Sequence, residues 1–175
     1  MTEDLLPAIQ RMLARASIGA STVRSQGAPG VAVVVREFLA ELQLKPFSTA
    51  NIAVFSRTLD QQTQRLEEVL PRAARSWGLA RKCLNIFLRE AFYNAFLQVR
   101  YGLAVAERLY EIPLDGIVAK ALRSQLPGVL PPWPGVRHLD QRSSFIYQSV
   151  AQQLAEKQGI ARVHLDAFLW GGNRE

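Results

Sequence analysis

Residues 77–98 read WGLARKCLNIFLREAFYNAFLQ, and this stretch decides the fold. From residue 81 onward its apolar side chains recur at three- and four-residue spacing, which predicts a long helix over residues 81–98. The four residues before it, 77–80, contain a glycine and predict a tight connection. We therefore expect a helical hairpin over about residues 66–98, whose second helix begins with the basic pair Arg81-Lys82.

Helical spacing of apolar residues also dominates the sequence on both sides of this hairpin. Two segments rich in glycine, serine or proline, residues 17–30 and 127–135, predict loops. No alternating pattern typical of a strand is apparent, so we expect an all-α fold in which residues 1–175 form a single helical domain. The other expected helices are 2–16, 31–44, 52–59, 65–74, 103–110, 114–122, 140–157 and 163–170.

The composition is that of an ordinary globular chain, with 175 residues, 49% hydrophobic and 21% charged. A single cysteine, Cys83, excludes an intrachain disulfide and a cysteine-based zinc site, and it favours a reducing intracellular compartment. We expect no metal and no membrane span, because the longest apolar run, residues 31–35, is far shorter than the roughly 20 residues needed to cross a bilayer. Glu3 and Asp4 argue against a signal peptide.

The net charge of +6 is concentrated in the middle of the chain. Residues 71–125 carry nine basic and four acidic side chains, whereas residues 1–70 carry seven of each. A polyanion is the natural partner for such a segment. A basic surface that serves only solubility is the alternative that charge alone leaves open.

Lys82 has the sequence context of a reactive amine. Exposed backbone N–H groups at a helix start attract phosphate, and the positive end of the helix together with Arg81 disfavours the charged ammonium form of Lys82. A lysine needs a depressed pKa to act as a nucleophile. The chain has only four lysines against seventeen arginines, which suggests that chemistry retains this one. A basic pair on the surface of a helix N-terminus is the simpler alternative.

Two carboxylates stand out after the hairpin. Pro113 ends one segment, and Asp115 falls in the first turn of the next expected helix, where the helix dipole keeps it ionised. Asp166 and Trp170 are four residues apart and share a helix face, an arrangement that suits an aromatic ring bearing N–H donors, such as a purine base. An ordinary N-terminal helix aspartate and a core-packing tryptophan are the alternatives.

Together these features resemble the helix–hairpin–helix glycine/proline/aspartate DNA glycosylases. In that superfamily a lysine beginning the second hairpin helix is the nucleophile and an aspartate after a proline-containing loop is the essential carboxylate; these positions match Lys82 and Asp115. The 33-residue spacing between them and the closing His-Leu-Asp-x-x-x-Trp are similar to the archaeal 8-oxoguanine DNA glycosylase branch, in which the matching acid and tryptophan, here Asp166 and Trp170, hold the flipped base. The resemblance covers about residues 65–170. The usual second hairpin glycine is replaced by Ala80.

The resemblance implies a fold of two helical lobes with the active site between them. It implies a DNA repair enzyme that excises 8-oxoguanine by base flipping, forms a Schiff base through Lys82 and cleaves abasic sites by β-elimination without a cofactor. Gln26 is a candidate for reading the purine edge. The candidate phosphate contacts are Gly78, Ala80, Arg81 and Arg75, together with Arg72 and Arg89.

The expected partner is double-stranded DNA that contains a damaged base, bound by a monomer in the cytoplasm at the nucleoid. Two other readings of the sequence stay open. One is a non-catalytic helical DNA-binding module in which the hairpin persists but the pocket is filled. For this module we expect Lys82 and Asp115 to lie more than about 10 Å apart, since catalysis needs both near one sugar. The other is a helical protein-interaction domain whose basic stretch meets an acidic partner.

Overall fold

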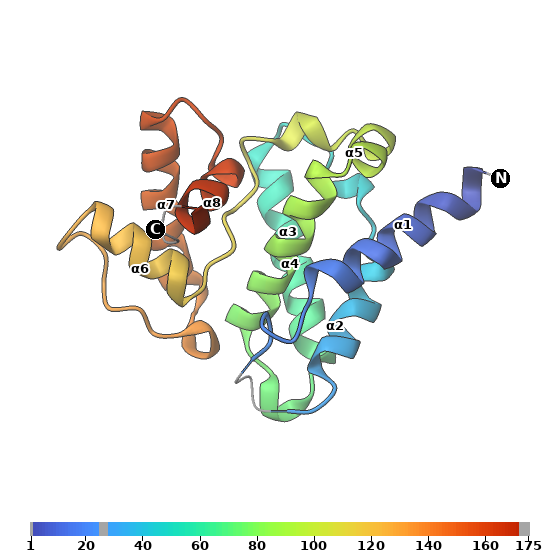
Figure 1. Cartoon of the computed structure of the whole chain (residues 1–175), viewed down its shortest axis with the longest axis horizontal. Helices are drawn as coiled ribbons and strands as arrows, with labels where there is room; N and C mark the ends of the chain where they lie inside the picture. The colour runs from blue at the N-terminus through green and yellow to red at the C-terminus, as the bar shows by residue number, and fades with distance from the viewer. Residues whose placement is uncertain (1, 25–27, 172–175) are drawn as a thin grey trace.

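The computed structural model describes residues 2–24 and 28–171. All regular structure in this part of the chain is helical, without a strand, which confirms the all-α class (Figure 1). None of its helices is both long and apolar enough to cross a membrane. The α-helices are α1 (Thr2–Ser17), α2 (Val31–Ala40), α3 (Ile52–Val69), α4 (Trp77–Tyr93), α5 (Ala95–Tyr101), α6 (Gly116–Gln125), α7 (Gln141–Lys157) and α8 (Arg162–Gly171). Short 3-10 turns are η1 (Lys45–Phe47), η2 (Arg72–Ala74), η3 (Leu103–Ala106) and η4 (Val136–His138).

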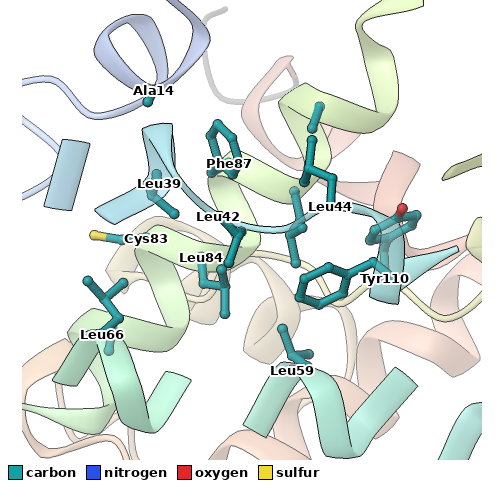
Figure 2. Packing of buried hydrophobic residues seen from close by; sticks show 14 of the residues in the cluster. Ala14, Leu39, Leu42, Leu44, Leu59, Leu66, Cys83, Leu84, Phe87 and Tyr110 are labelled. Carbon is teal, nitrogen blue, oxygen red and sulfur yellow. The ribbon is translucent and has the colours of Figure 1, made fainter. Parts of the chain in front are cut away.

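Helix α4 is the centre of the fold. Ser76 caps its N-terminus through a hydrogen bond from the Leu79 N–H to the serine hydroxyl (3.3 Å). Helices α1, α2, α3, α5 and α7 and the turn η4 all pack on α4, so that most of its side chains are buried. Figure 2 shows Leu84 and Phe87 of α4 among leucines from α2, α3 and the segment that links them. A helix surrounded in this way buries polar side chains as well as apolar ones, and Arg81, Lys82 and Asn85 are among its buried residues.

The buried hydrophobic residues form two clusters, and each belongs to one group of helices. The first cluster is built mainly from the helices α1, α2, α3, α4 and α5. The second is built mainly from α6, α7 and α8, which lie together on one side of the molecule (Figure 1). Val163, near the start of α8, belongs to the first cluster, whereas Leu165 belongs to the second. The two lobes are therefore joined through α8 as well as through the chain segment that precedes α6.

That segment is an extended stretch over residues 110–115. Its midpoint is held by Gln148 of α7, whose buried side-chain amide accepts from the Ile112 N–H (3.1 Å) and donates to the Ile112 carbonyl (2.7 Å). Both backbone groups of Ile112 are thereby satisfied in the absence of a sheet. This contact fixes the path of the chain just before Asp115.

The predicted hairpin connection is wrong in its boundary. Helix α4 begins at Trp77 and not at Arg81, so Gly78 and Ala80 lie in its buried first turns. A Cβ on Gly78 would come within 2.1 Å of the Val136 carbonyl oxygen and 2.7 Å of the Leu139 Cβ. The glycine is required by the close approach of η4, a contact from 58 residues further along the chain, and not by a turn.

Other boundaries also moved. Helix α3 runs unbroken from Ile52 to Val69, and the expected long helix over 81–98 ends at Tyr93. Asn94 ends α4 and caps α5, because its side chain accepts a hydrogen bond from the Leu97 N–H (3.1 Å). Residues 103–106 form a 3-10 turn instead of the start of an α-helix.

We expect Gly78→Ala to lower the free energy of unfolding by about 1–3 kcal/mol, because η4 must shift to admit the methyl group. Urea denaturation of both proteins measures the difference. Gly116→Ala is the matched control: Gly116 also lies in the first turn of a helix, and the nearest atom to its added Cβ is 3.9 Å away. Equal stability of the Gly78→Ala and Gly116→Ala proteins would contradict the packing role of Gly78.

Candidate active site between the two lobes

Lys82 and Asp115 meet where the two lobes face each other. The Nζ atom of Lys82 lies 3.8 Å from Oδ2 of Asp115 and donates a hydrogen bond to the carbonyl oxygen of Thr22 (3.1 Å). Lys82 stands in the second turn of α4, and its side chain is only 10% exposed. A non-catalytic module is expected to separate Lys82 and Asp115 by more than about 10 Å, and the observed separation is far shorter.

Asp115 is held in place by the start of α6. It is the N-cap of that helix, and its Oδ1 accepts hydrogen bonds from the N–H groups of Ile117 (2.9 Å) and Val118 (3.0 Å). The sequence predicts this residue in the first turn of a helix over 114–122, but the helix starts two residues later than expected, so Asp115 precedes it. Capping uses only Oδ1, and the second oxygen is left facing Lys82.

A cavity of about 400 Å³ adjoins this pair. Thr22 and Asp115, the two partners of Lys82, both line it, and α8 contributes Asp166. Helix α4 supplies Ile86, Arg89, Glu90 and Tyr93. Lys82, Ile86, Arg89 and Tyr93 are spaced by four, three and four residues, so they form one stripe along α4. That spacing is visible in the sequence, and it could have indicated that Ile86 and Tyr93 belong to the site.

Asp166 is the most deeply buried carboxylate of the site, with a side chain 3% exposed. Its Oδ2 forms an ion pair with the guanidinium of Arg89, which also contacts Glu90 (2.6 Å). Its Oδ1 is buried without a hydrogen-bond partner. A buried carboxylate oxygen left unsatisfied is costly, and Asp166 is among the residues that line the cavity.

Cys83, next to Lys82, points into the protein core. It is fully buried, and this burial raises the pKa of its thiol to about 12. A thiol in that state does not act as a nucleophile near neutral pH. In the part of the chain that the structure describes, no three histidine, cysteine, aspartate or glutamate side chains gather as a metal site requires.

Several sequence-predicted contacts lie elsewhere. Arg81 is buried (5% exposed), forms an ion pair with Asp60, lies 3.3 Å from Glu111 and donates to the Thr63 hydroxyl (2.9 Å). Arg81 is buried and paired with carboxylates, and Gly78 and Ala80 are also buried, so none of the three is open to a phosphate in this structure.

Arg75 is exposed and donates to the Glu68 carbonyl (2.8 Å), so it stays a predicted phosphate contact. The guanidinium of Arg89, in contrast, forms an ion pair with Asp166. Trp170 belongs to α8, but its side chain lies outside the described part of the structure, as does Gln26.

A scan against protein-family models and searches of curated proteins and of solved structures found no match to this chain.

We expect Arg89→Met to lower the free energy of unfolding by about 3 kcal/mol, because it leaves the Asp166 carboxylate buried without its counter-charge. The double variant Arg89→Met/Asp166→Leu should recover most of that loss, since it removes both charges. Urea denaturation measures both. Arg75→Met, at an exposed arginine, should change stability by no more than about 0.5 kcal/mol. A double variant as unstable as Arg89→Met would contradict the pairing.

Proposed function

We propose that this protein is a DNA glycosylase that excises an oxidised purine, 8-oxoguanine, and then cleaves the abasic strand. The observation that carries the proposal is the placement of Lys82 beside Asp115, which lines a cavity that the carboxylate-bearing Asp166 also lines. An amine, an aspartate and a hydrogen-bond acceptor are the groups needed to attack a sugar, stabilise its positive charge and hold a base.

The cavity suits an extrahelical nucleotide. Its volume, about 400 Å³, lies in the range of small-ligand sites, and a base inside a duplex must leave the stack to be reached by an enzyme. The carboxylate of Asp166, a residue that lines the cavity, accepts an N–H of the flipped base in this proposal. Trp170, four residues later on α8, stacks on the base in this proposal.

The chemistry follows from the two atoms that face the sugar. As the bond between C1′ and the base nitrogen breaks, its electron pair leaves with the base, and the Asp115 carboxylate stabilises the positive charge on the sugar. Lys82 loses a proton to Asp115 and attacks C1′ through Nζ, and ring opening gives a Schiff base. Loss of a C2′ proton then expels the 3′ phosphate, and water releases the lysine from the unsaturated aldehyde.

Affinity for the duplex comes from the basic middle of the chain. Arg72 and Arg75 in and beside η2 are exposed and lie just before α4, close in sequence to the nucleophile. Contacts of such side chains with phosphates position a protein on DNA without reading its sequence, and they weaken with salt.

We expect a covalent adduct when the protein is incubated with duplex DNA that holds one 8-oxoguanine and is treated with borohydride, which reduces the Schiff base to a stable amine. Lys82→Gln should abolish the adduct, and Lys120→Gln, at an exposed lysine of α6, should form it at the parental level. Gel electrophoresis of labelled DNA detects both the adduct and the nick.

If the protein forms no adduct and makes no nick with any damaged base, the enzyme proposal is wrong. Binding of duplex DNA at low salt would then point to a DNA-binding module. Absence of binding would point to a protein-interaction domain.

Asp115→Asn should lower the rate of base excision about 10²- to 10⁴-fold and leave the affinity for DNA nearly unchanged. Asparagine caps a helix as well as aspartate does, so α6 keeps its start while the charge that faces Lys82 is lost. Single-turnover kinetics and fluorescence anisotropy measure the two quantities. Parallel losses of rate and affinity would indicate instead that Asp115 acts only through the structure.

A further inference from the structure

Three side chains from three elements form a hydrogen-bonded chain at the end of the cavity. Nε2 of His164 on α8 lies 2.7 Å from Oε1 of Glu107, and Nδ1 of the same ring lies 2.9 Å from the hydroxyl of Tyr93 on α4. The Tyr93 and His164 rings are stacked, with centroids 5.8 Å apart and planes 28° apart. The His164 side chain is 28% exposed, and both of its ring nitrogens are engaged.

Glu107 determines which nitrogen of His164 carries the proton. A carboxylate only accepts hydrogen bonds, so Nε2 of His164 is the donor to Glu107, and in the neutral form of the ring Nδ1 is an acceptor. The Tyr93 hydroxyl then donates its only hydrogen to Nδ1. Burial raises the pKa of Tyr93 above its usual range, which keeps this hydrogen in place near neutral pH.

A tyrosine whose hydrogen is committed can only accept from any further partner. Tyr93 lines the same cavity as Asp166, and it is 47% exposed. We propose that Glu107 and His164 hold the Tyr93 hydroxyl as a hydrogen-bond acceptor for the ligand of this cavity, so that Tyr93 is a specificity-determining residue and Glu107 and His164 are its positioning residues.

Two acceptors on one cavity select the edge of the ligand. The Asp166 carboxylate and the Tyr93 oxygen belong to residues that both line the cavity, and both accept hydrogen bonds; a guanine-type base carries two adjacent donors, the N1–H and the 2-amino group. An adenine-type base presents N1 as an acceptor, which would face another acceptor without a hydrogen between them. This inference rests on the proposed function for the identity of the ligand, whereas the hydrogen-bonded chain exists without DNA.

The orientation of the chain can be measured in the free protein. Nitrogen-15 NMR of histidine-labelled protein distinguishes the two imidazole tautomers, and His138→Gln assigns the signals because the chain has only two histidines. We expect the Nε2–H tautomer for His164. Glu107→Ala should shift the signals toward a mixture of tautomers, and a predominant Nδ1–H tautomer in the parent protein would overturn the inference.

The selectivity of Tyr93 for the ligand is tested in the Lys82→Gln protein, which is expected to bind DNA without reacting. Fluorescence anisotropy compares duplexes that hold 8-oxoguanine, 8-oxoadenine or no lesion. Tyr93→Phe should lower the preference for 8-oxoguanine over 8-oxoadenine about fivefold, the effect of one hydrogen bond, while it keeps the stacked ring. Glu107→Ala, which loses only the positioning carboxylate, should lower it less. Tyr101→Phe, on α5, is the matched control and should leave it unchanged.

The outcomes separate the two proposals. If the Lys82→Gln protein binds 8-oxoguanine duplex no better than undamaged duplex, the proposed function fails and the ligand half of the inference fails with it. If that lesion preference is present and Tyr93→Phe retains the full selectivity for 8-oxoguanine, the inference alone is overturned. A fall in selectivity with Tyr93→Phe and not with Tyr101→Phe supports it.

Discussion

A charge inside a protein is costly unless an opposite charge or hydrogen-bond partners accompany it, and the central helix α4 carries three largely buried cations. Each finds its partner on a different element. Arg81 pairs with Asp60 of α3 and Glu111 of the extended segment, Lys82 with Asp115 at the start of α6, and Arg89 with Asp166 of α8. The pairs of Lys82 and Arg89 tie the second lobe to the first along one helix. The candidate site lies beside these ion pairs, between the two lobes.

The segment between the lobes needs partners for its backbone, since it belongs to no helix. Arg162 at the start of α8 donates to the carbonyl oxygens of Leu109, Tyr110 and Gln148. Burial lowers the pKa of this guanidinium, and nearby Glu111 opposes that effect. Together with the two hydrogen bonds between the Gln148 side chain and the backbone of Ile112, these bonds hold the chain on both sides of Glu111. Asp115 therefore reaches Lys82 from a chain whose path is already determined.

Local pattern predicted much of this arrangement, and contacts distant in sequence account for the errors. Apolar spacing identified α7 within one residue at its start, and a proline followed by an aspartate located the start of α6. Gly78 was interpreted as a turn residue because the sequence does not show that η4 packs against it. Arg81 was expected on the surface because its partners, Asp60 and Glu111, lie 21 and 30 residues away. Helical spacing could have placed Tyr93 on the stripe of Lys82, but its bond to His164 depends on how α8 packs.

The groups of the site share one arrangement: each commits one atom to the fold and leaves a second atom outside that contact. Asp115 caps α6 through Oδ1 and faces Lys82 through Oδ2. Asp166 binds Arg89 through Oδ2 and keeps Oδ1 unsatisfied, and Tyr93 gives its hydrogen to His164 and retains its oxygen lone pairs. Because the first atom is already bound, orienting the second costs little when a ligand arrives. The unsatisfied oxygen of Asp166 is the free-energy cost of that readiness, and a base with matching donors would relieve it.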